Sequence, residues 1–326
     1  MESATKFPKT LQQAVVYFSK QENCEAFMTQ VRWPDGKVKC PQCGLEKVSR
    51  LSTPIAMWKC YGKHPRQKFS LKVGTIFEDS PLGLEKWLPA AWLICNCKNG
   101  ISSYELSRAL AITQKSTWFM LHRIRLAMQE HGSFLKLGGP GTEVEVDETF
   151  IGGKARNMHL DKRERRITGT GGKDKTIVMG ILERGGRVRT NVLPNRKKHA
   201  VQGQVKAHVS AGSALYSDAL KSYDGLAQEY AHQVIDHAEK YVEGRVHTNG
   251  LENFWSLTKR TLGGTYVSVE PFHLFRYLDE QSFRYNNRRD ANDGDRFLLV
   301  MSQIVGKRLT YAELTGKEVD REARAN

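Results

Sequence analysis

Hydrophobic and polar positions alternate in short runs through the second half of the chain, and this pattern predicts strands interspersed with helices. Runs of β-branched and aromatic residues that end in glycine or polar turns are typical of strands. They predict strands at TEVEVDETFIGG (142–153), TIVMGILE (176–183), GRVRTNVL (186–193), ALYSD (214–218) and HQVID (232–236). Helical spacing predicts helices over 198–210, from HTNGLENFWSLTKR (247–260) to a stop at Gly263-Gly264, and over FHLFRYLDEQSFRYNN (272–287). This order of elements predicts an α/β domain with a mixed sheet over residues 143–305.

The first half of the chain has mostly helical spacing, interrupted by a cysteine-containing stretch with turn residues. Residues 8–30 predict one or two short helices, and residues 84–96 predict another. The segment HGSFLKLGGPGTE (131–143) has four glycines and a proline, which indicates a domain boundary. We therefore expect five parts. They are a helical lead-in with a zinc ribbon (1–80), a helix-turn-helix region (81–131), a linker (132–142), the α/β domain (143–305) and a charged tail (306–326).

Three cysteines and a histidine have the spacing of metal ligands. Cys40 and Cys43 form a C-x2-C pair, and Cys60 and His64 follow after a gap of sixteen residues as C-x3-H. Cysteine and histidine ligands at such spacing, between β-branched and aromatic runs, are typical of a zinc ribbon with a structural Zn²⁺. The alternative is three unrelated reduced cysteines and a surface histidine. The C-x2-C pair is the clearer half of the motif, and His64 is inferred as the fourth ligand.

Residues 102–125 predict a helix-turn-helix. Ser102 followed by Glu105 predicts a capping box at the start of the first helix, and Thr113 opens the second. The second helix carries basic residues that we expect to contact DNA, namely Lys115, Arg123 and Arg125. A plain pair of helices without DNA contacts is the alternative.

The formal net charge of +15 favours a polyanionic partner, and double-stranded DNA is the leading candidate. A basic, glycine-rich loop after Asp147 is suited to binding phosphates, although a solvated loop is the alternative. Its basic residues include Lys154, Arg156, Arg163, Arg165 and Arg166. The amino terminus lacks an apolar signal segment, and the longest apolar run is too short to cross a membrane. We therefore expect a cytoplasmic protein without a membrane partner.

Three acidic residues occupy three different predicted elements. Asp147 lies within the first strand of the α/β domain, Asp218 ends a later strand, and Glu252 lies in the first turn of a helix. A ribonuclease H-like sheet gathers carboxylates from such positions at one edge, and oxygen ligands of this kind suit Mg²⁺ or Mn²⁺. Lys259 follows Glu252 by seven residues, close to two helical turns, and can hold a DNA phosphate from the same helix face. Glu148 should point to the other face of the strand, so we expect it to lie outside the site.

Each acid alone has a structural interpretation, as a surface residue or a helix cap, so the functional one depends on their combination. The segments VEVDETFIGGK (144–154), LYSDALKSYDGL (215–226) and HTNGLENFWSLTKRTLGGTY (247–266) resemble the three blocks of bacterial insertion-sequence DDE transposases. CPQCG (40–44) and KVGTIFEDS (72–80) resemble the group of these enzymes that carries an amino-terminal zinc ribbon.

The resemblance implies a ribonuclease H-like catalytic core, two divalent metal ions, and DNA cleavage and strand transfer at the ends of a transposon. By the motif, Asp147 and Asp218 match the first two acids, Glu252 the third, and Lys259 the downstream lysine. Asn249 is the alternative third residue, because some relatives use asparagine there, but a carboxylate holds a divalent ion better than an amide. A homodimer or larger assembly on DNA is also implied.

Two other functions remain open from the sequence. One is a DNA-binding regulator that keeps the zinc ribbon and the helix-turn-helix while its α/β domain serves only as a scaffold. The other is a ribonuclease H-like nuclease that cleaves DNA without joining it.

Overall fold

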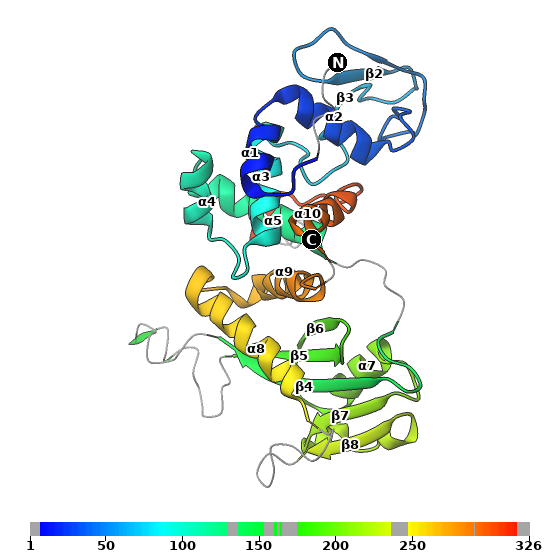
Figure 1. Ribbon diagram of the computed structural model, residues 1–326, viewed down its shortest axis with the longest axis vertical. Helices are drawn as coiled ribbons and strands as arrows, with labels where there is room; N and C mark the ends of the chain where they lie inside the picture. Colours follow the sequence, from blue (N-terminus) through cyan, green and yellow to red (C-terminus); the bar gives the residue numbers. More distant parts are fainter. Residues whose placement is uncertain are drawn as a thin grey trace, which may run out of the picture. The chain divides into compact units, whose positions relative to one another are not determined.

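The computed structural model describes residues 7–129, 136–152, 160–161, 164, 175–235, 247–289 and 291–317. The chain divides into two compact units (Figure 1). The first consists of Met1–Gln129 together with Asp290–Asn326, and the second of Glu130–Arg289. The α/β domain expected over 143–305 therefore ends earlier, because the segment after residue 290 folds with the first unit.

The first unit combines a small sheet with helices from both ends of the chain. Its strands are β1 (Val48–Arg50), β2 (Met57–Cys60) and β3 (Lys68–Ser70), which pair antiparallel in the order β1-β2-β3. Its helices are α1 (Leu11–Phe18), α2 (Gln21–Arg32), α3 (Leu84–Asn96), α4 (Ser103–Leu110), α5 (Gln114–Met128), α10 (Asp293–Ser302) and α11 (Tyr311–Thr315).

The predicted helix-turn-helix is present as α4, a tight turn and α5. Ser102 Oγ accepts a hydrogen bond from the Glu105 amide, and the Glu105 carboxylate accepts one from the Ser102 amide, each at 3.1 Å. This reciprocal pairing is the capping box that the sequence predicts. Ala111 lies in the left-handed region (φ 51°) at the end of α4, and Thr113 caps α5 through the Ser116 amide. Local sequence therefore determines where both helices begin.

An aromatic cluster explains why α10 belongs to the first unit. Phe297 of α10 stacks on Phe27 of α2 with ring centroids 5.5 Å apart. It also lies 5.6 Å from the ring of Phe18 and 5.2 Å from that of Trp92. All four side chains are at most 7% exposed. Burial of several aromatic rings in one cluster stabilises a fold strongly, so α10 is part of this core.

The segment expected as a charged tail from residue 306 also packs on the first unit as far as it is described. Lys307 Nζ donates to the carbonyl oxygens of Leu126 and Gln129, at 3.1 and 3.2 Å. Tyr311 at the start of α11 packs edge-on against Phe119 of α5. These contacts place residues 307–315 along α5.

The second unit is built on a five-stranded mixed sheet, as the sequence predicts. Its strands are β4 (Glu143–Ile151), β5 (Thr176–Glu183), β6 (Val188–Leu193), β7 (Ala214–Asp218) and β8 (Ala231–Ile235), in the order β6-β5-β4-β7-β8. β5 is antiparallel to β4 and β6, whereas β7 is parallel to β4 and β8. Counted from β4, the order is 3-2-1-4-5, consistent with a ribonuclease H-like core.

Helices cover both faces of this sheet (Figure 1). They are α7 (Lys198–His208), α8 (Asn249–Thr261) and α9 (Leu274–Asn286), with short 3-10 turns at Lys221–Tyr223, Leu226–Gln228 and Pro271–His273. Alternation along β5 separates two cores: Met179 and Ile181 pack with α7, whereas Val178 and Leu182 pack with α8. Alternate strand residues point to opposite faces, so every second residue of β4 and β5 faces α8.

The prediction that the helix stops at Gly263-Gly264 is wrong. The chain continues through Leu262–Tyr266 as a π-helix, and Val267 then takes a left-handed backbone conformation (φ 61°). The Tyr266 hydroxyl donates to the carboxylate of Glu280, a fully buried residue of α9. This bond gives the helical extension a fixed partner, which the two glycines alone do not reveal.

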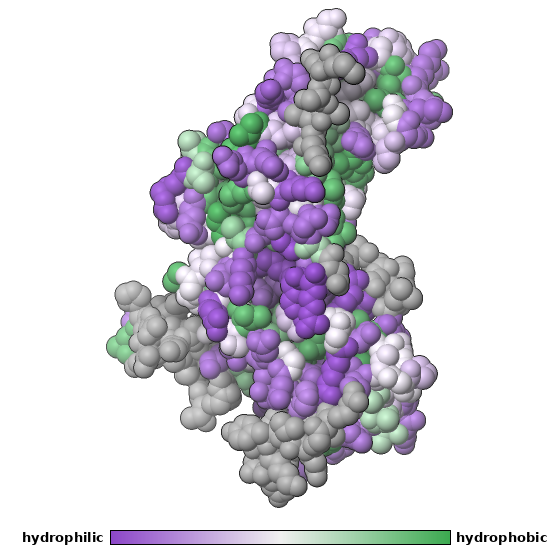
Figure 2. All heavy atoms as spheres, viewed as in Figure 1, coloured by the Kyte–Doolittle hydropathy of each residue, from purple (hydrophilic) through white to green (hydrophobic). Residues whose placement is uncertain are grey.

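Hydrophilic side chains cover much of the visible surface, with smaller apolar patches between them (Figure 2). Among the described helices, none is both long and apolar enough to cross a membrane.

Candidate metal cluster and active site

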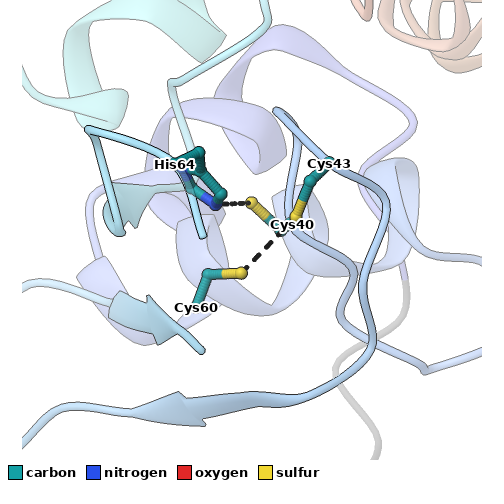
Figure 3. Close-up of side chains that lie close together, drawn as sticks. All are labelled: Cys40, Cys43, Cys60 and His64. Atoms are coloured by element: carbon teal, nitrogen blue, oxygen red, sulfur yellow. Dashed lines mark hydrogen bonds between the residues drawn. The ribbon is translucent and has the colours of Figure 1, made fainter. Parts of the chain in front are cut away.

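The four predicted zinc ligands converge in the first unit (Figure 3). The ligand atoms of Cys40, Cys43, Cys60 and His64 all lie within 4.8 Å of one another. Cys40 Sγ is 3.4 Å from His64 Nε2, and Cys43 Sγ is 3.6 Å from Cys60 Sγ. Of the described residues, these form the one group of histidine, cysteine and acidic side chains that is close enough to hold a metal ion.

The spacing of these atoms fits a tetrahedral Zn²⁺. Zinc–sulfur bonds of about 2.3 Å and zinc–nitrogen bonds of about 2.0 Å give tetrahedral edges of roughly 3.5 to 3.8 Å. The two measured separations are within a few tenths of an ångström of these edges. Gly62 lies beside the cluster, and a Cβ at this position would be 3.1 Å from Cys43 Sγ and 2.8 Å from Leu45. The donor set and the crowded surroundings therefore fit a structural zinc site.

Asp147 and Asp218 lie on neighbouring parallel strands of the second unit. The register of β4 and β7 pairs Val144 with Leu215 and Glu145 with Tyr216. Asp147 and Asp218 lie two residues beyond the last of these pairs, each on the α8 side of its strand, because alternate strand residues point to opposite faces.

Helix α8 brings Glu252 and Trp255 to the same face. Trp255 Nε1 donates to Asp147 Oδ2 at 2.9 Å, and Glu252 lies one helical turn earlier on α8. The pKa of Asp147 is raised from 3.8 to about 6, first by burial and then by the negative charges of Asp218 and Glu252, against the lowering effect of the Trp255 hydrogen bond. The charges of Asp218 and Glu252 therefore act on Asp147, although the three carboxylates do not form a metal-holding group in this structure.

Glu148 interacts with this cluster from the other face of β4. Its carboxylate accepts a hydrogen bond from the buried hydroxyl of Tyr223 on the α7 side. Burial raises its pKa to about 7, and the charges of Asp218 and Asp147 contribute to the increase. The side chain points away from α8, as the alternation of β4 predicts, yet the negative charges of Asp147 and Asp218 act on Glu148.

Glu145 and Trp255 lie at the contact between α8 and β4, and the sequence did not single them out. Glu145 shares the α8 face with Asp147 because the two are separated by two positions in β4, and it is 1% exposed. This i, i+2 spacing is a signal that could have identified it. Trp255 lies between Glu252 and Lys259 in the sequence, and its hydrogen bond to Asp147 follows from the packing of α8 on the sheet.

The predicted DNA contacts of α5 need correction. Arg123 is 4% exposed and Arg125 is 1% exposed. Arg123 donates to the carbonyl oxygens of Leu309 at 3.0 Å and Glu78 at 2.7 Å. Both guanidinium groups therefore lie inside the first unit, where they cannot reach a DNA groove in this conformation, and the carboxy-terminal segment provides one of the acceptors.

Lys115 remains exposed, with its ammonium group 4.9 Å from the ring centroid of Tyr311. Lys259 is exposed in the last turn of α8. The basic-loop residues expected to bind phosphates lie outside the described residues: Lys154, Arg156, Arg163, Arg165 and Arg166.

We expect Asp147→Asn to stabilise the metal-free protein. Because the pKa of Asp147 is raised in the folded protein, its carboxyl group destabilises the fold least below about pH 4, where it is protonated. Its ionisation lowers the free energy of unfolding as the pH rises through about 6. A shift of about two units corresponds to about 2 to 3 kcal/mol at neutral pH. In denaturant unfolding without divalent ions, the free energy of unfolding of Asp147→Asn should exceed that of the unaltered protein at pH 7.5, and by much less at pH 4.5. The exposed Asp224→Asn variant is the control. An equal increase in the free energy of unfolding in both variants would show that the buried charge of Asp147 is not the cause.

Two family models match the chain. The ISXO2-like transposase domain matches residues 136–286, and the transposase zinc-ribbon domain matches residues 19–62. Residues 136–286 are therefore similar to a transposase domain, and residues 19–62 to a transposase zinc ribbon. The first match lies within the second structural unit, and the second includes Cys40, Cys43 and Cys60.

One curated relative supports the same family. The chain is 27% identical over 258 residues to an uncharacterized protein in transposable element ISH50 of Halobacterium salinarum. The alignment covers 75% of this chain and 84% of that protein. No solved structure matches the chain. The zinc-ribbon match and the Cys3His cluster together support a structural zinc ion in this chain.

Proposed function

We propose that the chain cleaves DNA at the ends of an insertion sequence and transfers the freed 3′ ends to target DNA. The observation that carries this proposal is that the charges of Asp218 and Glu252 act on the buried Asp147 within the segment that matches a transposase domain. Three carboxylates offer the hard oxygen ligands that Mg²⁺ or Mn²⁺ prefers. The raised pKa of Asp147 supports the assignment, because a bound cation would favour the ionised form that burial disfavours.

The roles of the individual residues follow from their positions. Asp147, Asp218 and Glu252 would hold two divalent ions, and because their carboxylates do not form a metal-holding group in this structure, they would have to approach one another when the ions bind. In such sites two ions activate an attacking oxygen and stabilise the leaving one. Trp255 holds Asp147 Oδ2 through its indole N–H and thereby fixes the orientation of that carboxylate. Lys259 lies about 10 Å along the helix from Glu252, where its ammonium group can bind a phosphate of the DNA backbone.

The chemistry then requires two successive displacements at phosphorus. In the first, water displaces the 3′ oxygen from the phosphodiester and leaves a 3′ hydroxyl and a 5′ phosphate. In the second, this 3′ hydroxyl attacks a phosphodiester of the target and displaces its 3′ oxygen. Neither step needs a covalent enzyme intermediate. We expect at least two copies of the chain to act together, since two ends of the element must be joined.

Glu252 is our proposed third acid in preference to Asn249. The charge of Glu252 acts on Asp147, and Glu252 lies one turn before Trp255, which bonds to the same aspartate. Asn249 is the first residue of α8 and lies about 1.7 turns before Trp255. The coupling of charges therefore supports the carboxylate.

A strand-transfer assay tests the proposal. The full-length protein is incubated with labelled duplexes that carry the terminal repeats of its element, with plasmid target and Mg²⁺ or Mn²⁺. Metal-dependent nicking at the 3′ end of the element and joined products are expected. Nicking without joining would favour a nuclease, and tight binding without cleavage under either ion would favour a DNA-binding regulator.

A further inference from the structure

We propose that Glu145, held by Arg184, is a positioning residue that fixes the first turn of α8 and so places Glu252 beside Asp147. The inference rests on the proposed metal-dependent function and names what keeps its third acid in place. Glu145 itself does not need to touch an ion or DNA. It would act through the backbone of α8.

Glu145 connects the central strand directly to the start of the helix. Its Oε2 accepts a hydrogen bond from the Leu251 amide at 3.0 Å, and Leu251 immediately precedes Glu252. Amide groups in the first turn of a helix have no partner within the helix, and a negative charge is favourable there. Glu145 therefore satisfies one of these donors and anchors the turn that carries Glu252.

Arg184 neutralises this buried anchor and extends it. Arg184 Nε donates to Glu145 Oε1 at 2.8 Å, and Nη2 donates to the carbonyl oxygen of His247 at 2.6 Å. The guanidinium also lies over the ring of Tyr216, 4.4 Å from its centroid. A buried carboxylate is costly unless it is paired and hydrogen-bonded. Arg184 pairs with the buried Glu145 and, through its bond to His247, also fixes the backbone just before α8 begins.

Two glycines allow α8 to lie directly on the sheet. A Cβ at Gly250 would be 2.5 Å from Leu182 and 2.7 Å from Glu145 Oε2. Gly180 of β5 pairs with Asp147 in the strand register, and a Cβ there would be 2.6 Å from the ring of Trp255. The helix therefore has little room to shift, and it donates hydrogen bonds to the side chains of Glu145 and Asp147 in β4.

Strand β4 thus carries Asp147, a proposed metal ligand, and Glu145, which anchors the helical turn of a second proposed ligand, Glu252. Glu145 and Asp147 lie on the same face of β4, one hydrogen-bonded at the first turn of α8 and the other at Trp255. Groups that orient metal ligands change metal affinity by about 10- to 100-fold when they are removed. The same range is the expected effect of removing the negative charge of Glu145.

The test compares Glu145→Gln with Glu143→Gln. Glu143 is the matched control because it lies two residues earlier in β4 and also pairs with Arg184, at 3.5 Å, while its carboxylate accepts a hydrogen bond from the Tyr216 hydroxyl. Mn²⁺ binding to each full-length protein is measured by calorimetry, and the Mn²⁺ concentration for half-maximal cleavage is measured separately. We expect both values to rise about 10- to 100-fold for Glu145→Gln, with cleavage largely restored by excess Mn²⁺, and about two-fold or less for Glu143→Gln.

A second variant keeps the inference testable if Glu145→Gln does not fold. Gly180→Ala leaves every charge in place but forces Trp255 away from β5, so it should weaken Mn²⁺ binding in the same way. Unchanged Mn²⁺ affinity in a folded Glu145→Gln protein, or in Gly180→Ala if that variant replaces it, would overturn the positioning role. If the unaltered protein binds Mn²⁺ but does not cleave, the proposed function fails while the binding comparison still tests Glu145. If it binds no Mn²⁺, both fail.

Discussion

Asp218→Asn is expected to reduce metal-dependent cleavage of the element's ends by about 1,000-fold or more, equivalent to about 4 kcal/mol in activation free energy. The substitution keeps the shape of the side chain and its acceptor for the Leu220 amide, which now lies 3.1 Å from Asp218 Oδ1. It removes one negative charge from the coupled acids, so the fold should persist while the proposed ion site loses a ligand. A gel assay of nicked and joined DNA in Mg²⁺ and Mn²⁺ measures the loss.

Asp224→Asn is the matched control for this experiment. Asp224 is also an acid near the end of β7, but it is exposed and does not contribute to the raised pKa of Asp147. Its activity should stay within about two-fold of the unaltered protein, because an exposed surface substitution usually has small effects. Glu252→Gln and Asn249→Ala extend the series. If Asn249→Ala abolishes cleavage and Glu252→Gln does not, our choice of the third residue is wrong.

Cys60→Ser is expected to remove zinc from the protein and unfold the ribbon around β2. Cys60 is a fully buried ligand, 3.6 Å from Cys43 Sγ, and serine is a much weaker zinc ligand than a thiolate. Structural zinc contributes about 10 to 16 kcal/mol of apparent binding free energy in small zinc modules, and this energy is coupled to folding. Metal analysis should find about one zinc ion per unaltered chain and far less in the variant. Hydrogen exchange should accelerate at the amides of β1, β2 and β3.

Cys97→Ser is the control for Cys60→Ser, because it removes a thiol that lies outside the zinc cluster. Cys97 caps the end of α3 and is not part of the four-residue cluster. Its zinc content and its hydrogen exchange in the ribbon should match those of the unaltered protein. A full zinc complement in Cys60→Ser would show that another residue supplies the ligand.

The sequence predicted the parts of the fold whose signals are local. Strand alternation located all five strands of the mixed sheet, and the spacing of Cys40, Cys43 and Cys60 identified the metal cluster before any distances were known. These predictions succeeded because a period of two, a C-x2-C pair or a capping box depends on residues close together in the chain. The α/β fold class with a ribonuclease H-like strand order is confirmed.

The sequence could not show which distant segments pack together. Arg123 looks like a surface cation on an amphipathic helix, and only the return of Leu309 provides the acceptor that buries it. Glu145 likewise looks like one more polar residue of a strand. It becomes an anchor only because the first turn of α8, more than a hundred residues later, lies against it. Long-range partners of this kind leave no periodic signal.

The return of the chain to its first unit also has a consequence for biosynthesis. The aromatic core around Phe18 and Phe27 is incomplete until Phe297 of α10 has been made. Domains usually fold in order as they emerge from the ribosome. Here the unit that is translated first must wait for nearly the whole chain. A messenger truncated after the transposase domain would therefore yield a zinc-ribbon unit without its closing helix, exposing apolar surface that chaperones and proteases recognise.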